Sequence, residues 1–474
     1  MGKLGLLRMI CVVSMLNIAA TIASFAQTFT SIVNFDLTNG AGANAGLVQG
    51  TDGNFYGVTG LGGSSNNCTL GCGTVFKIIP SGIPSTVTTL YSFNGMDGSF
   101  ATGLVQGTDG SFYGTTANGG SSNNCNSGCG TVFKINAKGT LTTLHSFNGA
   151  DGSGPYSGLV EGTDGNFYGV TGLGGSSNNC TLGCGTVFKI NAKGTLTTLH
   201  SFDGSDGSGP QAGLIQATDG NFYGTTFSGG TLSGGTVFRM TASGTLTTLY
   251  KFCSQSNCAD GSSPYSGLVQ GTDGNFYGTT EGGGTNYNGT IFKMTAKGAL
   301  TTLHSFDNAD GYSPAGLVQG IDGNLYGTTQ GGGAIAFGTV FQITTKGALT
   351  TLHSFDDSDG ADPQSAPVQA TNGMFYGTTF FAGAGGFGSV YTLSMGLGLF
   401  VRTNPTSGNV GTRVIILGND LGGATSVTFN GTEATFKASG TYITATVPTG
   451  ASTGTVEVVT PQRILKSNVN FRVP

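Results

Sequence analysis

Short runs of alternating apolar and polar residues recur along most of the chain and predict an all-β protein. The clearest run is Gly-Leu-Val-Gln-Gly-Thr-Asp-Gly-Asn-Phe-Tyr-Gly at residues 46–57. It recurs with small changes and places its tyrosine at positions 56, 113, 168, 223, 277, 326 and 376. Self-similarity at a period of roughly fifty residues is typical of repeat architectures. The seven tyrosines therefore mark seven copies of one unit.

Each copy divides into four predicted strands. Leu-Val-Gln is followed by a Thr-Asp-Gly-Asn turn and by Phe-Tyr-Gly-Thr-Thr, because an Asp-Gly pair tolerates the backbone of a tight hairpin. A glycine-rich loop leads to Thr-Val-Phe-Lys-Ile, and a second turn leads to Leu-Thr-Thr-Leu-His-Ser-Phe. Four antiparallel strands in a unit of this length predict one blade of a β-propeller.

The seventh copy stops after its third strand, Ser389-Val390-Tyr391, and the missing fourth strand is found at the other end of the chain. Residues 28–35 match the fourth strand of the other copies, and no first three strands precede them. We therefore predict a seven-bladed propeller over residues 27–399, closed by the N-terminal strand 28–35. Closure of this kind removes the open sheet edge.

Antiparallel order predicts that the tight turns gather on one face of the propeller. The loops between second and third strands and the crossings between blades gather on the other, which we call the long-loop face. Residues 400–474 have a different pattern. Short alternating strands such as Val414-Ile415-Ile416-Leu417 and Val427-Thr428-Phe429 predict a small β-sandwich there.

Composition supports a folded exported protein. Glycine makes up 87 of 474 residues, tryptophan is absent and only 9% of residues are charged, which argues against a coiled coil. Residues 1–26 carry two basic residues, an apolar stretch and a small-residue end, typical of a signal peptide cleaved after Ala26. No later apolar run could span a membrane. We expect secretion, or a cell-surface or periplasmic location.

Removing Lys3 and Arg8 leaves 16 basic against 23 acidic residues, a formal charge of −7. Such a chain lacks the basic surface that nucleic-acid binding needs. Cys11 leaves with the signal segment, and the other eight cysteines form close pairs. In an exported chain they predict four local disulfides, which stiffen the long-loop face: Cys68/Cys72, Cys125/Cys129, Cys180/Cys184 and Cys253/Cys258.

Two resemblances follow from these motifs. The repeat, with its Gly-Thr-Val-Phe-Lys-Ile third strand, resembles the GloVer tandem repeat of exported bacterial surface proteins, which implies a propeller-like fold and no assigned activity. The order of strands after residue 403 is similar to the IPT/TIG immunoglobulin-like domain. In exported bacterial proteins that domain mostly acts as a spacer or adhesion stalk.

Candidate catalytic groups are few, and no known catalytic motif is present. The four histidines, at 145, 200, 304 and 353, share a fourth-strand position with Val33, Tyr91 and Tyr250, so we interpret them as packing residues. The first strands carry six glutamines and Glu161, which we interpret as cross-links between blades. Glu161 and Glu281 are the acid or base candidates of an alternative enzymatic function.

We predict no metal site and no cofactor. The cysteine pairs have no nearby histidine, and the repeated Asp-Gly pairs form turns, although the crossing aspartates leave Ca²⁺ as an open alternative. Six aromatic residues lie in long-face loops without a strict repeat role and are candidates for stacking on sugar rings. They are Tyr156, Tyr265, Tyr287, Tyr312, Phe337 and Phe387.

These observations favour a non-catalytic exported binding, adhesion or scaffold protein that contacts a glycan or a surface protein through its long-loop face. The alternatives are a propeller enzyme that acts on polysaccharide and a purely structural envelope protein. The sequence does not indicate an oligomeric state.

Overall fold

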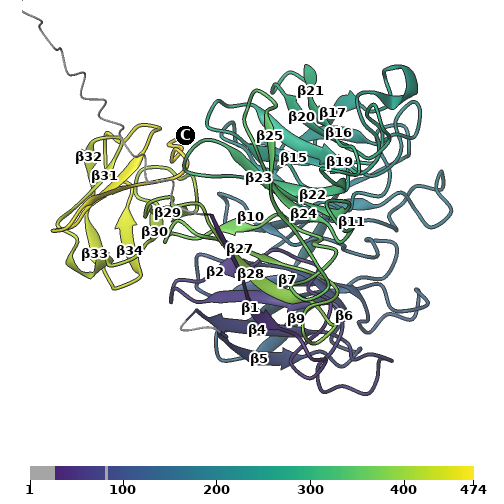
Figure 1. Cartoon of the computed structure of the whole chain (residues 1–474), viewed down its shortest axis with the longest axis horizontal. Helices are drawn as coiled ribbons and strands as arrows, with labels where there is room; N and C mark the ends of the chain where they lie inside the picture. The colour runs from purple at the N-terminus through teal and green to yellow at the C-terminus, as the bar shows by residue number, and fades with distance from the viewer. Residues whose placement is uncertain (1–26, 81–83) are drawn as a thin grey trace, which may run out of the picture.

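The computed structural model describes residues 27–80 and 84–474, so the predicted signal segment 1–26 lies outside the described residues. The described part contains nine four-stranded sheets, of which seven are the propeller blades and two form the C-terminal domain, which lies to one side of the propeller in Figure 1. All of their neighbouring strands are antiparallel. The fold is the predicted seven-bladed β-propeller followed by a β-sandwich.

The blades follow one another along the chain, and each begins with its innermost strand. The first blade contains β2 (Val48–Gln49), β3 (Phe55–Thr59), β4 (Thr74–Ile79) and β5 (Thr86–Ser92), and the second contains β6 (Ser99–Gln106), β7 (Phe112–Asn118), β8 (Thr131–Ile135) and β9 (Leu141–Ser146). The third contains β10 (Val160–Glu161), β11 (Phe167–Thr171), β12 (Thr186–Ile190) and β13 (Leu196–Ser201). The fourth contains β14 (Ile215–Gln216), β15 (Phe222–Thr226), β16 (Thr236–Met240) and β17 (Leu246–Lys251).

A short 3₁₀ turn, η1 (Ser256–Cys258), lies in the crossing to the fifth blade. The fifth blade contains β18 (Val269–Gln270), β19 (Phe276–Thr280), β20 (Thr290–Met294) and β21 (Leu300–Ser305). The sixth contains β22 (Tyr312–Gln319), β23 (Leu325–Gly331), β24 (Thr339–Ile343) and β25 (Leu349–Ser354). The seventh contains β26 (Val368–Gln369), β27 (Phe375–Thr378), β28 (Ser389–Ser394) and β1 (Thr28–Asn34).

The N-terminal strand closes the ring as predicted. Strand β1 pairs antiparallel with β28, from Thr28 opposite Ser394 to Asn34 opposite Ser389. The register shifts between Ser31 and Val33, at the place where the outer pair of the other blades also shifts. The last blade is therefore built from both ends of the propeller sequence.

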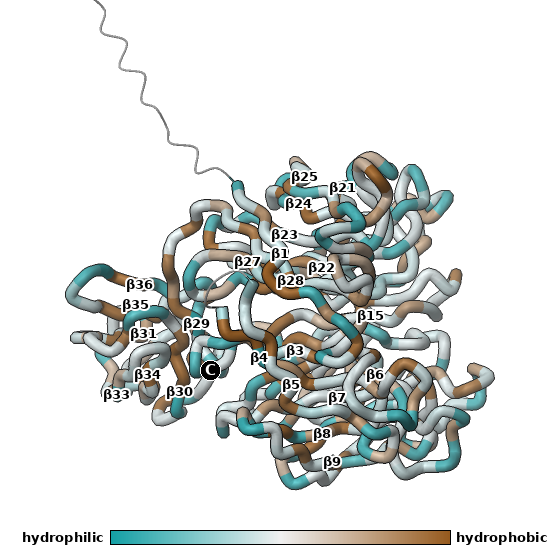
Figure 2. The backbone as a smooth tube through the Cα atoms, turned by 60° about the horizontal axis from the view of Figure 1, so that its bottom comes forward, coloured by the Kyte–Doolittle hydropathy of each residue, from teal (hydrophilic) through white to brown (hydrophobic). Residues whose placement is uncertain are grey.

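Stacked aromatic rings fill the space between blades. Tyr113 stacks on Phe167 of the next blade with ring centroids 3.9 Å apart, and Tyr376 stacks on Phe55 across the closing junction at 4.0 Å. The glycine after each such tyrosine makes room within the blade. At Gly169, an added Cβ would lie 2.6 Å from the Phe188 ring. Figure 2 shows apolar colour along many strands, with hydrophilic residues frequent in the loop tips.

The C-terminal β-sandwich has two sheets. One contains β29 (Arg402–Asn404), β30 (Arg413–Leu417), β34 (Tyr442–Thr446) and β33 (Phe436–Ala438), and the other contains β32 (Thr432–Glu433), β31 (Ser426–Phe429), β35 (Val456–Val459) and β36 (Ile464–Lys466). A 3₁₀ turn, η2 (Leu421–Gly423), precedes β31. The inward side chains of both sheets form one core cluster.

The sandwich is docked on the tight-turn face of the propeller. The Thr441 hydroxyl donates to the Thr51 carbonyl at 2.7 Å, and the Asn404 amide donates to the Gln106 carbonyl at 2.9 Å. The backbone N–H of Phe400 donates to the Thr371 carbonyl at 3.2 Å. These contacts involve the first, second and seventh blades. The long-loop face is therefore the side of the propeller away from the C-terminal domain in Figure 1.

Candidate functional site

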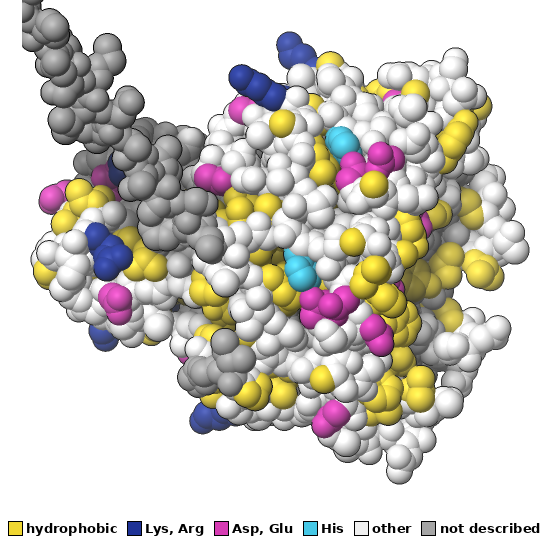
Figure 3. Space-filling view, in the orientation of Figure 1, with side chains coloured by type: hydrophobic (Ala, Val, Ile, Leu, Met, Phe, Trp, Pro, Cys, Tyr) yellow, Lys and Arg dark blue, Asp and Glu magenta, His cyan; other side chains and the backbone are white. Residues whose placement is uncertain are grey.

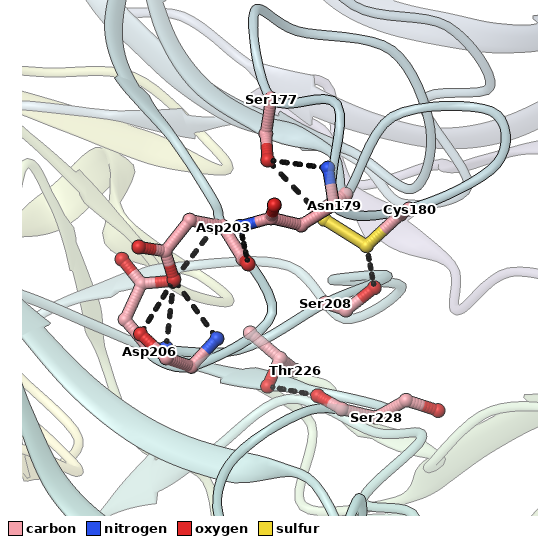
Figure 4. The surroundings of a disulfide bond; sticks show 10 residues. Ser177, Asn179, Cys180, Asp203, Asp206, Ser208, Thr226 and Ser228 are labelled. Atoms are coloured by element: carbon pink, nitrogen blue, oxygen red, sulfur yellow. Dashed lines mark hydrogen bonds between the residues drawn. A yellow bond between two sulfur atoms is a disulfide. The ribbon is translucent and has the colours of Figure 1, made fainter.

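Four disulfides stiffen the long-loop face, as the cysteine spacing predicts. Three lie in loops between second and third strands, and the fourth lies in the crossing that contains η1: Cys68–Cys72, Cys125–Cys129, Cys180–Cys184 and Cys253–Cys258. Figure 4 shows the surroundings of Cys180, where the Asn179 amide donates to the Asp203 carbonyl at 2.9 Å. The bond ties the disulfide loop to the crossing of its own blade, which places both on one face.

The histidines have a role that the packing interpretation missed. His200 Nε2 lies 2.7 Å from Asp206 Oδ2 in the next crossing, and the same aspartate accepts from the backbone N–H of Asp203 through Oδ1. Six blades contain this anchor: Tyr91–Asp97, His145–Asp151, His200–Asp206, Tyr250–Asp260, His304–Asp310 and His353–Asp359. Figure 3 shows two surface histidines beside acidic side chains.

Either histidine or tyrosine can occupy this position, because each side chain is a ring with a polar group that reaches the carboxylate. Each ring also packs edge-on against the phenylalanine two residues later, as His200 does against Phe202. The packing interpretation was therefore incomplete. The position connects the outer strand to the crossing, and it carries valine only in the closing strand, at Val33.

A cavity of about 420 Å³ opens at the centre of the long-loop face. Every blade contributes the residues just before or at the start of its first strand, so the cavity is the mouth of the central channel. Its floor consists largely of glycine, alanine, serine and threonine, and its described lining residues include no charged side chain. The size is in the range of ligand pockets, about 300–1,000 Å³.

Aromatic and amide side chains surround this channel mouth. Tyr156 and Tyr265 come from two non-adjacent blades, and the other aromatic or amide lining residues are Phe100, Asn44, Gln211 and Gln364; Leu104, Leu268 and Leu317 also line the cavity. Two polar atoms here are buried without a hydrogen-bond partner, Asn44 Oδ1 and Ser157 Oγ. Ser157 is only 9% exposed. Buried polar atoms without partners are costly, so a bound group that satisfied them would gain stability.

The structure separates the six predicted aromatic candidates. Tyr156 and Tyr265 line the channel mouth, whereas Tyr312 and Phe337 line a second cavity of about 520 Å³ near the junction of the sixth and seventh blades. Tyr287 is 64% exposed and lines neither cavity. Phe387 packs against the core cluster of the closing blade.

Sequence reasoning missed several residues of the long-loop face. Asn44, Gln211 and Gln364 stand at the same place before the first strand of their copies as Tyr156 and Tyr265, so an alignment of the copies at that position identifies them. Phe100 lies one residue earlier in its copy, within β6. Loops after the second strand also expose large apolar side chains: Leu70, Leu182, Leu232, Tyr287, Ile335 and Phe381.

Two partly buried carboxyls lie near Tyr265. Burial raises the pKa of Glu281, and burial also raises the pKa of Asp362, whose carboxylate accepts a hydrogen bond from the Gln364 amide at 3.0 Å. Burial raises the pKa of the Tyr265 hydroxyl, and the charges of Glu281 and Asp362 add to that effect. Asp362 has a positive φ of 55°, an uncommon backbone for a non-glycine residue.

Glu161, the other acid candidate, lies at the opposite end of the channel, within a ring of cross-links between blades. Its two carboxylate oxygens accept from the backbone N–H and hydroxyl of Thr108, at 3.0 and 2.8 Å. The side-chain oxygen of each of the six glutamines likewise accepts a hydrogen bond from a backbone N–H in the tight turn of the preceding blade. The pairs are Gln49 with Thr371, Gln106 with Thr51, Gln216 with Thr163, Gln270 with Thr218, Gln319 with Thr272 and Gln369 with Ile321.

Glu161 and Glu281 cannot flank one bond, because they lie at opposite ends of the channel. Glu161 ends a first strand, next to the tight turns, and Glu281 follows a second strand, next to the long loops. Burial raises the pKa of Glu161, and the hydrogen bonds from Thr108 only partly offset that effect.

The tight-turn aspartates form a separate, repeated network. Asp109 accepts from the Lys134 ammonium at 2.8 Å and from the Tyr113 hydroxyl at 2.8 Å. Burial alone would raise the pKa of Asp109, but bonds from Lys134, Ser111 and Tyr113 outweigh burial and lower it. Asp109 lies in the turn between the first and second strands and bonds side chains of the second and third strands. This position agrees with the interpretation of these aspartates as turn residues.

Within residues 27–80 and 84–474, no group of three or more His, Cys, Asp or Glu side chains could hold a metal ion. The same residues include no helix that is long and apolar enough to cross a membrane.

Comparison with known families identifies both parts of the chain. A family profile described as "Gloeobacter/Verrucomicrobia repeat" matches residues 69–259 and 253–436, which together make up most of the chain. The chain belongs to this family. The IPT/TIG domain profile matches residues 400–473, so in this Gloeobacter/Verrucomicrobia repeat protein the sandwich is a TIG domain. No curated protein sequence matches the chain.

Solved structures similar to this repeat protein include a fungal alcohol oxidase of the AA5 family in complex with copper. It shares 13% identity over 93% of this chain and 99% of its own, with a TM-score of 0.52. PorZ, a surface component of the Porphyromonas gingivalis type IX secretion system, shares 17% identity over 93% and 60% of the two chains, with a TM-score of 0.46. A luciferin-regenerating enzyme shares 12% identity over 79% and 97%, with a TM-score of 0.41. At these identities the oxidase likeness bears on the fold alone.

Proposed function

We propose that this repeat protein is an exported, non-catalytic binding protein whose ligand is a neutral glycan held at the channel mouth. The observation that carries the proposal is the composition of the mouth, where aromatic and amide side chains surround an uncharged cavity. Aromatic faces stack on sugar rings, and amide groups can donate and accept hydrogen bonds with hydroxyls. The absence of charged groups from the described lining favours a neutral sugar over an acidic one.

Two further features support a binding role for the long-loop face. Disulfides in three blades and in one crossing hold the loops in place, which lowers the ordering entropy that a ligand contact would otherwise cost. The exposed apolar side chains on the loops around the mouth, such as Leu182 and Phe381, provide contact area for a polymer or a protein that carries the glycan. The disulfides also fit an extracellular location.

The docked TIG domain is expected to act as a rigid base. Its hydrogen bonds to the tight-turn face join it to the first, second and seventh blades, which a freely moving spacer would not do. In this proposal the TIG domain covers one end of the propeller and leaves the long-loop face directed outward.

A glycan array on residues 27–474 tests the proposal, followed by matched tyrosine variants. Tyr265→Ala removes a ring from the mouth and is expected to weaken binding of any captured neutral glycan at least about tenfold. Tyr287→Ala removes an exposed ring outside the mouth and is the control, with affinity unchanged, because the array presents short glycans without the polymer or protein that the outer loops would contact. Equal losses in both variants, or array binding restricted to acidic glycans, would contradict the proposal.

The second candidate is an enzyme that acts on polysaccharide, with Glu281 as the acid. The raised pKa of Glu281 favours it, because a carboxyl with a raised pKa holds its proton to a higher pH and can donate that proton to a leaving group. Asp362 is then the second carboxyl, in place of Glu161. Release of reducing sugar from a polysaccharide panel, lost in Glu281→Gln and retained in Glu161→Gln, would support this function over the first.

A further inference from the structure

Another cavity lies between the propeller and the TIG domain, on the face opposite the channel mouth. It is a cavity of about 390 Å³, lined by the ends of β2 and β6 and by β29 and residues 468–469 of the TIG domain. Arg402 of β29 is its one charged described lining residue. The cavity is therefore different in chemistry from the uncharged mouth.

Arg402 has few partners for its five N–H donors. The guanidinium donates to the Gln49 carbonyl at 3.4 Å, a long hydrogen bond. None of the ion pairs in the described part of the chain includes Arg402. Burial lowers the pKa of this arginine, which is the effect of placing a cation away from water without a matching anion.

One other lining residue has a buried polar atom without a partner, the Asn468 side-chain oxygen. The Thr403 hydroxyl is also buried and unpaired, but Thr403 alternates with Arg402 along β29 and lies on the side of the sandwich core, as Val401 does. Asn468 Oδ1 can only accept, whereas a guanidinium can only donate. A group that satisfied the whole set would bring both a negative acceptor and a hydroxyl donor.

We propose that this cavity binds a small polyhydroxylated carboxylate, such as a uronic acid. Its carboxylate would accept paired hydrogen bonds from Arg402, because the planar fork of a guanidinium matches the two oxygens of a carboxylate. One of its hydroxyls would donate to Asn468 Oδ1. The site holds parts of both domains, so the ligand would also join the TIG domain to the propeller.

Titration calorimetry of residues 27–474 with D-glucuronate tests the proposal, with D-glucose as the uncharged analogue and sulfate at matched ionic strength as the inorganic anion. Glucuronate is expected to bind at least tenfold more tightly than either. Arg402→Gln should remove this binding. Arg413→Gln changes an exposed arginine of the same TIG domain and should leave it unchanged. Equal affinity for sulfate would mean an adventitious anion site only and would overturn the proposal, as would binding retained in Arg402→Gln.

A second variant covers the case in which Arg402→Gln does not fold. Asn468→Asp keeps the arginine but adds a negative charge beside the cavity, and it should weaken glucuronate binding at least tenfold. Tyr265→Ala, in the opposite face, should have no effect, which separates this site from the neutral-glycan site. Glucuronate binding that Tyr265→Ala removed and Asn468→Asp retained would move the ligand to the channel mouth and overturn this proposal.

Discussion

Phe29 of the closing strand stacks on Tyr391 of β28, with ring centroids 5.1 Å apart. The same ring lies 3.6 Å from the His353 ring of the sixth blade, in a parallel stack. One side chain near the start of the described chain therefore joins the two blades on either side of the last junction. Closing strands also remove a sheet edge, so this contact protects the propeller from both opening and edge association.

Phe29→Ala is expected to destabilise the protein by about 1–3 kcal/mol, below the full cost of a buried phenylalanine because Phe29 is only partly buried. Urea unfolding followed by circular dichroism measures it. Phe29→Leu keeps most of the apolar contact and should recover much of the loss. A Phe29→Ala variant as stable as the parent would show that β1 contributes little to closure.

Glu161→Gln is expected to stabilise the protein by about 0.5–1.5 kcal/mol at pH 7. The glutamines of five other blades donate their amide to the turn carbonyl four residues later, as Gln216 does to Gly220 at 3.0 Å, and a carboxylate cannot. Burial raises the folded pKa of Glu161, so its ionised form opposes folding.

The pH dependence of that gain has a definite sign. A carboxyl whose pKa is higher in the folded state favours folding below its unfolded pKa and loses that contribution as the pH rises through the folded pKa. The advantage of Glu161→Gln should therefore be largest at high pH, shrink as the pH falls through the raised folded pKa, and be smallest below the unfolded value of about 4.3. Melting temperatures of both proteins at pH 3.5, 5 and 7 measure it. A gain that grew on acidification would contradict the assignment.

Asp273→Asn tests the tight-turn network. Burial alone would raise the pKa of Asp273, but hydrogen bonds from Lys293, Asn275 and Tyr277 outweigh it and hold the pKa well below the ordinary 3.8. This carboxylate therefore stabilises the fold above pH 3.8, and the contribution is lost as the pH falls through the lower folded value. Since Asp273 is partly exposed, the loss at pH 7 should be below about 1 kcal/mol.

The difference between Asp273→Asn and the parent should decrease from pH 7 to pH 2.5, as measured by thermal melting. The seventh blade already carries asparagine at this position, where the Asn372 amide donates to the Tyr376 hydroxyl at 3.1 Å, so the variant should still fold. An undiminished difference at pH 2.5 would mean that the asparagine perturbs the turn itself rather than removing a charge.

Much of the fold could be predicted because each blade repeats the same local pattern. The Asp-Gly turns, the alternating strands and the incomplete seventh copy gave the strand order, the closing strand and the disulfide-rich face before any contact was known. The docking of the TIG domain could not be predicted. It depends on single contacts such as Thr441 with Thr51, which have no repeat and no pattern along the chain.

The candidate site was predictable only in part, for a related reason. Tyr156 and Tyr265 were recognised as loop aromatics, yet their shared position at the mouth follows from the ring, which brings together residues of non-adjacent blades. The pairing of the fourth-strand ring with an aspartate six residues later is present in five copies. The valine at the same position, Val33, suggests apolar packing, although the other six residues at that position are His or Tyr and can form a hydrogen bond.

The anchor between His200 and Asp206 provides the last test, because the chain supplies both of its replacements. His200→Tyr copies Tyr91, whose hydroxyl donates to Asp97 at 2.5 Å, and should change the free energy of unfolding by less than about 0.5 kcal/mol. His200→Val copies Val33 and leaves the partly buried Asp206 carboxylate without its side-chain partner, which should cost about 1–2 kcal/mol. Urea unfolding at pH 7 compares the two. Equal stability of both variants would return His200 to a packing role, whereas a loss confined to the valine variant would establish that the ring is there to hold the crossing of the long-loop face.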